Sequence, residues 1–204
     1  VSARHCYEFT KGSGCMESKP KIAVIIGTTR EGRFGDTIAR WFMGVASARE
    51  DMEFELLDLR DYSLPFLTEP VPPAAGKVDP AAETWAAKIE SADGFVMLTP
   101  EYNRGYPAVL KNAIDHLYQQ WNTKAIGFVS YGGGAGGARA VEQLRLVAIE
   151  MQMAPIREGV VIPMARMAFD ESGQPTNPTL NDRATSMLNQ LAWWTTALRA
   201  ARVR

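Results

Sequence analysis

The chain has 204 residues and few of the side chains that build metal centres or disulfide-bonded folds. It contains two histidines, His5 and His116, and two cysteines, Cys6 and Cys15. Both cysteines lie in the N-terminal segment, where we expect free thiols; a bridge between them is the alternative. Because the predicted core has no cysteine and histidine is scarce, a zinc or iron–sulfur site is not expected.

The sequence also lacks a charge excess and a long apolar run. Its formal net charge is −1, so neither a basic surface for nucleic acid nor an acidic disordered tail is indicated. A membrane-spanning helix needs about 20 apolar residues, and no run reaches that length. The N-terminal segment has no apolar core of the signal-peptide kind. We therefore expect a cytoplasmic protein that binds neither nucleic acid nor membranes.

The composition is that of one globular domain. Hydrophobic residues make up 46% of the chain and charged residues 22%, which is enough apolar material for a sizeable core. We expect residues 1–20 to form an N-terminal tail, mobile or in part non-native. Residues 21–204 are expected to form the folded domain.

Apolar runs that predict strands alternate with amphipathic patterns that predict helices. Continuous apolar runs indicate strands buried on both faces, and they cover residues 21–26, 52–59, 94–100, 124–131 and 155–163. Between them, apolar residues recur at helical spacing, as in Ile38, Trp41, Phe42 and Val45. Asp79 and Thr179 are predicted helix caps, and Pro107 is predicted to open a helix. This alternation predicts an α/β fold with a mostly parallel sheet covered on both faces.

Two long segments do not fit this alternation. Residues 60–78 are rich in proline, and residues 164–178 contain the turn "DESGQP". Long loops in compact α/β domains are often functional, although a solvated loop is the simpler interpretation.

Ligands of an open parallel sheet bind at the carboxyl ends of the strands, where the strand order reverses. The first such loop, residues 27–37, reads "GTTREGRFGDT". Its glycines, its arginines Arg30 and Arg33 and the helix that follows predict a phosphate site. It is not a P-loop, because Arg33 and Phe34 replace the required lysine and hydroxyl residue, and Thr29 breaks the Rossmann spacing. A polar turn with exposed arginines is the alternative.

The loops after the third and fourth strands are also unusual. Residues 99–107 turn abruptly polar after a buried strand, and residues 130–139 read "SYGGGAGGAR". So many glycines leave bare backbone, against which a flat ligand can lie; a flexible loop is the alternative. The three loops together predict a site for a mononucleotide with a planar ring.

Three segments resemble the NAD(P)H-dependent FMN reductases. These are "GTTREGRFGDTIARW", "PEYNRGYPAVLKNAIDHL" and "SYGGGAGGARAVEQLR", and the resemblance covers residues 21–163. It implies a flavodoxin-like three-layer sandwich with a five-stranded parallel sheet in the order 2-1-3-4-5. It further implies bound FMN, NADPH or NADH as co-substrate, and two-electron reduction of quinones, free flavin, azo or nitro compounds or metal oxyanions.

The resemblance also assigns the residues that contact FMN. No catalytic side chain and no metal are expected, because flavin N5 carries the chemistry. Asp36 beside a phosphate would be unfavourable, so we expect it to cap its helix instead. The predicted cofactor-binding residues are Thr28, Arg30, Arg33, Gly35, Asp36, Thr37, Pro100, Glu101, Tyr102, Asn103, Ser130, Tyr131, Gly132 and Gly133.

Assembly and kinetic order are further expectations. Four apolar side chains in the proline-rich segment need burial, which with the resemblance predicts a homodimer or homotetramer: Tyr62, Leu64, Phe66 and Leu67. Donor and acceptor must share the exposed flavin face, which predicts ping-pong turnover. A non-catalytic electron carrier, an FMN-binding regulatory module and a flavin-free nucleotide enzyme are alternatives. The near-neutral charge argues against a carrier.

Overall fold

The computed structural model describes residues 18–202. Most of the predicted tail, with Cys6 and Cys15, lies outside these residues. The sheet consists of parallel strands in the order β2-β1-β3-β4-β5, as predicted, and β6 also pairs with β4. The strands are β1 (Lys21–Ile26), β2 (Glu53–Asp58), β3 (Gly94–Pro100), β4 (Ala125–Tyr131), β5 (Ala154–Pro155) and β6 (Val160–Ile162).

The predicted fifth strand, residues 155–163, is split in two. β5 pairs with the start of β4, where Ala125 faces Ala154. β6 pairs with the end of β4, where Tyr131 faces Ile162. Both short strands lie at the edge of the sheet and pair only with β4. Between them, the charged side chains at positions 157 and 158 are exposed and partly exposed, where the ladder is interrupted. The sheet is therefore six-stranded by count.

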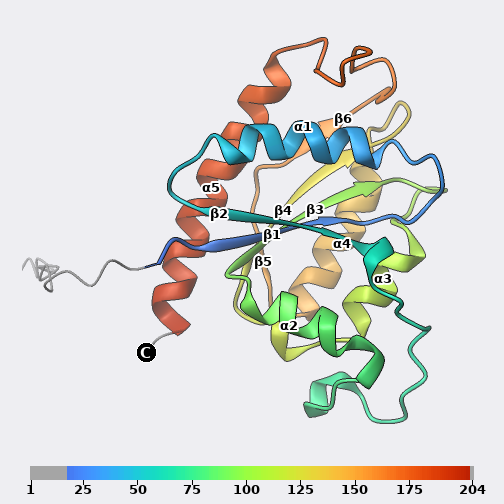
Figure 1. The fold of residues 1–204 in the computed structure, drawn as a ribbon, viewed down its shortest axis with the longest axis vertical. Coiled ribbons are helices and arrows are strands. Elements are labelled where there is room, and N and C mark those ends of the chain that lie inside the picture. The colour runs from blue at the N-terminus through green and yellow to red at the C-terminus, as the bar shows by residue number, and fades with distance from the viewer. Residues whose placement is uncertain (1–17, 203–204) are drawn as a thin grey trace, which may run out of the picture.

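Helices cover both faces of the sheet (Figure 1). α1 (Gly35–Ser47) and α5 (Thr179–Arg202) pack on one face, against Ile22, Val24 and Ile26 of β1. The other face carries α2 (Glu83–Ser91), α3 (Ala108–Asp115) and α4 (Ala138–Glu150). Alternate residues of β1 enter the two cores, as the pleat of a strand requires. The result is the predicted three-layer sandwich.

The predicted helix starts are right in part. The carboxylate of Asp79 accepts the backbone N–H of Ala81 at 2.8 Å, as a cap should. Pro107 immediately precedes α3. Thr179, however, is the first residue of α5, and the accepting side chain is Asn177.

Asp36 is not a cap, and that prediction is wrong. The residue before α1 is Phe34, and no side chain caps this helix. The carboxylate of Asp36 accepts instead from the buried guanidinium of Arg33 at 2.6 Å. A buried charge needs a charged partner more than an exposed helix end needs a cap.

The proline-rich segment, residues 60–78, begins within the short helical turn η1 (Leu59–Asp61). Its first apolar side chains, Tyr62 and Leu64, are partly buried against the α2–α4 core. Phe66 is 77% exposed. His116, the only histidine in the described residues, is buried, and its Nε2 lies 2.7 Å from the carbonyl of Pro65. Within residues 18–202, no helix has both the length and the apolar character to cross a membrane.

Candidate functional site

A cleft of about 400 Å³ lies at the carboxyl ends of the central strands. This volume is within the usual range for small-molecule sites. Four loops supply its lining: Arg30, Glu31, Gly32, Arg33, Phe34, Pro100, Glu101, Tyr102, Tyr131, Gly132, Gly133, Met164, Ala165, Arg166 and Met167. The three predicted loops therefore meet, and the segment that begins at Met164 joins them.

Some predicted site residues stand behind or beside the cleft. Thr28 and Ser130 are buried. Gly35, Asp36 and Thr37 begin α1. Asn103, with a φ of 49°, lines a smaller adjoining cleft with Arg104 and Arg139.

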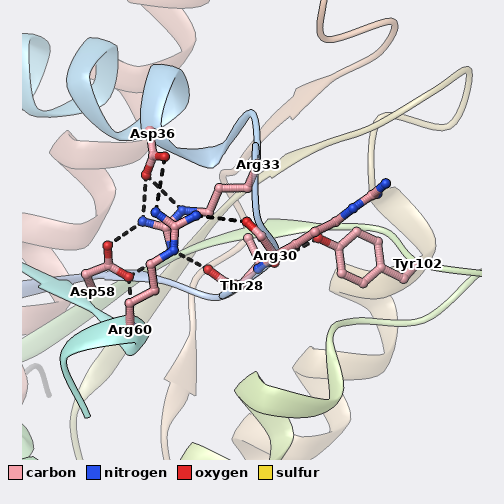
Figure 2. A network of polar contacts seen from close by, with 7 residues as sticks. All are labelled: Thr28, Arg30, Arg33, Asp36, Asp58, Arg60 and Tyr102. Atoms are coloured by element: carbon pink, nitrogen blue, oxygen red, sulfur yellow. Dashed lines mark hydrogen bonds and ion pairs between the residues drawn. The ribbon is translucent and has the colours of Figure 1, made fainter. Parts of the chain in front are cut away.

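A hydrogen bond joins the loop after β1 to the loop after β3. The hydroxyl oxygens of Thr28 and Tyr102 are 2.7 Å apart. The guanidinium of Arg30 lies 5.9 Å from the centroid of the Tyr102 ring (Figure 2). Among residues 18–202, no hydrogen bond or ion pair engages this guanidinium. The guanidinium of Arg30, which lines the cleft, is therefore available to bind an anionic group of a ligand.

Arg33 has a different environment (Figure 2). Its side chain is 1% exposed and forms ion pairs with Asp36 and Asp58. Burial would lower the pKa of Arg33, but hydrogen bonds from its guanidinium to Asp58 and Asp36 outweigh burial and raise it. Likewise burial would raise the pKa of Asp58, but the Arg33 bond outweighs this and lowers it. Both groups stay charged at neutral pH.

Tyr131 places an unpartnered hydroxyl group in the wall of the cleft. The residue is buried, and no group in the described chain bonds its hydroxyl. Burial, assisted by Tyr102, raises the pKa of this phenol, so it remains a neutral donor. A Cβ added at Gly35 would lie 2.6 Å from the hydroxyl oxygen, so a side chain there would force Tyr131 to move.

The glycines of residues 132–137 have two distinct roles. A Cβ at Gly133 or Gly134 would meet nothing within 4 Å, so their backbone is open. Gly136 and Gly137 have φ values of 59° and 85°, and a side chain at either would collide with backbone at 2.8–2.9 Å. The first part of the loop is thus accessible to a ligand, while the second is glycine for close packing.

Glu101 secures the loop after β3 to the start of α4. Its carboxylate accepts from Nε of Arg139 at 2.5 Å and from the backbone N–H of Arg139 at 3.2 Å. The Glu101 side chain is 7% exposed. Its carboxylate is therefore committed to Arg139, and its role at the cleft is to hold two loops together.

Residues 164–167 form the fourth wall of the cleft, and the sequence did not identify any of them as site residues. Backbone N–H groups of Met164 and Ala165 donate to the carbonyls of Gly133 and Gly132 at 3.0 and 2.9 Å. Arg166 lies 5.6 Å from the centroid of the Phe34 ring. The irregular sequence of residues 164–178 was the only signal for this wall, and no motif marked the individual residues.

These groups fit a flavin mononucleotide. Arg30 and Arg166 supply positive charge for a phosphate. Tyr131 offers an unpartnered hydroxyl group, and the backbone of Gly132 and Gly133 is open to a flat ring. A parallel sheet with such a site at its switch point defines a flavodoxin-like mononucleotide-binding protein.

Comparison with known proteins gives the family. The model of the NADPH-dependent FMN reductase family matches residues 20–166. An NAD(P)H-dependent FMN reductase of Schizosaccharomyces pombe is 43% identical over 153 residues, which is 72% of this chain and 76% of the relative. An NAD(P)H:quinone oxidoreductase of Solanum tuberosum is 34% identical over 182 residues, 85% of this chain and 92% of the relative. The chain belongs to the NADPH-dependent FMN reductase family.

Solved structures agree on the fold. A flavoenzyme NAD(P)H:(acceptor) oxidoreductase from Paracoccus denitrificans superposes with a TM-score of 0.69 at 20% identity. The match covers 87% of this chain and 98% of that one. Family and fold together make the chain an FMN-dependent oxidoreductase with NADPH or NADH as its reductant.

Proposed function

We propose that the chain binds FMN in the 400 Å³ cleft and uses NADPH or NADH to reduce quinones and similar flat acceptors. The observation that carries this proposal is the meeting of an arginine-bearing loop with an open glycine backbone at one sheet edge. Relatives named as quinone reductases support the acceptor class, among them a 2-hydroxy-1,4-benzoquinone reductase from Burkholderia sp. Free flavin, azo and nitro compounds and metal oxyanions remain predicted acceptors.

Each wall of the cleft has a task in this function. Bound FMN supplies hydride transfer between the nicotinamide and the second substrate. Arg30 binds the phosphate, and the neutral hydroxyl of Tyr131 donates a hydrogen bond to the cofactor. The backbone at Gly132 and Gly133 leaves space for the ring. Met164 and Met167, which are 52% and 72% exposed, offer apolar surface to flat substrates.

The phosphate assignment is tested by titrating apo-protein with FMN. A charge-assisted hydrogen bond contributes roughly 1.5–3 kcal/mol, so Arg30→Ala should weaken FMN binding about ten- to a hundredfold. Arg183→Ala is the matched control, because Arg183 is exposed on α5 and does not line the cleft. Equal affinities for the two variants would place the phosphate elsewhere.

Ping-pong turnover follows if donor and acceptor stack on one face of the ring. Two planar ligands cannot occupy that face together, so the oxidised nicotinamide leaves before the acceptor enters. Initial rates at several fixed quinone concentrations should give parallel double-reciprocal lines against NADPH. Intersecting lines together with a trapped ternary complex would contradict a shared face.

We propose at least a homodimer, with a homotetramer as the alternative, in the cytoplasm. Support for assembly comes from the proline-rich segment, where Phe66 is 77%, Val71 40% and Leu67 37% exposed. Such adjacent apolar side chains are unusual on a monomer surface. Light scattering at micromolar concentration should give a multiple of 22.5 kDa, and Phe66→Ser should lower it. A monomeric mass for the unaltered protein would contradict assembly.

A further inference from the structure

We propose that Arg33 is a positioning residue and not a phosphate ligand. Together with Asp36, Asp58 and Arg60 it forms an ion-pair cluster that holds the loop after β1 in its phosphate-binding conformation. The inference rests on the proposed function, since it takes the FMN phosphate to lie at this loop. It gives a role to Asp58 and Arg60, which lie at and just after the end of β2.

The hydrogen bonds of Arg33 leave it no donor for a phosphate. A guanidinium has five N–H groups. Nε donates to Asp36 at 2.8 Å, and Nη2 donates to Asp36 at 2.6 Å and also to Asp58. Nη1 donates to Asp58 at 2.8 Å and also to the carbonyl of Thr28. A phosphate could gain an N–H of Arg33 only by displacing one of these acceptors.

The charges of the cluster support the same assignment. Arg33 stands between two carboxylates, and Arg60 lies 3.5 Å from Asp36. The four charges sum to zero. A phosphate placed on Arg33 would therefore meet Asp36 and Asp58 at close range, where like charges repel. Arg30 has no acidic partner among residues 18–202, and it can bind the anion without this opposition.

The cluster also orients the backbone of the loop. The carbonyl of Thr28 accepts from Arg33, and the carbonyl of Arg30 accepts from Arg60 at 2.8 Å. In a planar trans peptide the N–H points opposite to the carbonyl. The N–H groups of Thr29 and Glu31 are therefore directed away from the cluster, and neither donates a hydrogen bond to another group of residues 18–202. The N–H of Arg30, which lies between them, donates to the side-chain oxygen of Thr28 at 3.3 Å. Two free backbone N–H groups on one turn, beside the guanidinium of Arg30, favour the binding of an anion.

The inference is tested by whether Asp58→Asn strengthens or weakens FMN binding. Removing a negative charge near an anion site should strengthen FMN binding if Coulomb attraction alone matters. If Asp58 positions the loop through Arg33, the same change should weaken FMN binding at least tenfold. Asp61→Asn is the control, because it removes the same charge from an exposed side chain in η1 outside the cluster.

Riboflavin, which has no phosphate, separates loop positioning from general damage. Apo-protein should lose FMN affinity on Asp58→Asn while its riboflavin affinity changes less than threefold. Equal losses for both flavins, or unchanged or tighter FMN binding, would overturn the inference. Asp36, the other carboxylate partner of Arg33, is half-exposed, so Asp36→Asn is a milder change. This variant should also lose FMN affinity while keeping riboflavin affinity, and it replaces Asp58→Asn in the test if that variant does not fold.

The outcome for the unaltered protein distinguishes this inference from the proposed function. If the unaltered protein binds FMN no better than riboflavin, the phosphate site itself is wrong. If it prefers FMN and Asp58→Asn keeps that preference, the phosphate site stands and the positioning role of Arg33 and Asp58 is wrong.

Discussion

The closeness of Gly35 to Tyr131 predicts how Gly35→Ala changes the stability of the protein. The change should depend on whether the hydroxyl of Tyr131 is present. Gly35 is the first residue of α1, and Tyr131 is the last residue of β4. In the interior of a helix, alanine is favoured over glycine by up to about 1 kcal/mol. Here Gly35→Ala should instead destabilise the apo-protein, because the hydroxyl of Tyr131 occupies the space that a methyl group needs.

The magnitude follows from the geometry. The added Cβ would lie 2.6 Å from the Tyr131 oxygen, whereas ordinary contact begins at 3.4 Å. Overpacking of a rigid site costs about 1–3 kcal/mol, and the helix preference for alanine offsets part of it. A net loss of about 1–2 kcal/mol is expected. Without the hydroxyl, the nearest atoms are on Ile26 at 3.4 Å and Arg33 at 3.6 Å, which are ordinary contacts.

Urea unfolding of four proteins measures this effect. The set is the unaltered chain, Gly35→Ala, Tyr131→Phe and the double variant, all without flavin. Gly35→Ala should cost about 1–2 kcal/mol in the unaltered background and nothing, or a slight gain, in the Tyr131→Phe background. Tyr131→Phe alone should be neutral or stabilising, since its hydroxyl is buried without a partner. An equal cost of Gly35→Ala in both backgrounds would refute the reasoning.

Three further predictions concern other contacts. Tyr102→Phe should cost about 1 kcal/mol of unfolding free energy, and Thr28→Val more, because the Thr28 hydroxyl also accepts the backbone N–H of Arg30. The double variant should cost little more than Thr28→Val, since both changes remove one shared hydrogen bond, and additive costs would contradict this. Burial lowers the pKa of Lys124 to about 8, so the penalty for its buried charge is present below pH 8 and is relieved as pH rises towards about 10.4. The unaltered protein should therefore gain up to about 3 kcal/mol over that range relative to Lys124→Met, and parallel pH profiles in urea unfolding would contradict this. Arg139→Gln should weaken FMN binding by freeing the Glu101 loop, and unchanged affinity would show that Arg139 does not hold the site.

Much of the fold could be predicted because short stretches of the sequence determine where each strand and helix forms. Each buried strand is a short apolar run, and each helix repeats apolar residues at its own period. The strand order 2-1-3-4-5 came with the family resemblance, and the structure confirms it. The split of residues 155–163 was not predicted, because it depends on which residues pair with β4, and that pairing is a tertiary contact.

The site could be predicted only in part. The three loops and most of the cleft-lining residues follow from glycine, arginine and the motif "PEYN". The distant carboxylate partner of Arg33 could not be found this way, because Asp58 lies 25 positions along the chain and is brought close only by the pairing of β2 with β1. The same holds for Met164 and Ala165, whose backbone bonds to the glycine-rich loop are tertiary contacts.

The central claim is that FMN in this cleft passes electrons from a nicotinamide to a quinone. Anaerobic titration of the FMN-loaded protein tests it directly. One equivalent of NADPH or NADH per chain should bleach the flavin absorption, and one equivalent of benzoquinone added afterwards should restore it. A flavin that stays oxidised with both nicotinamides, or a reduced flavin that the quinone does not reoxidise, would contradict the account.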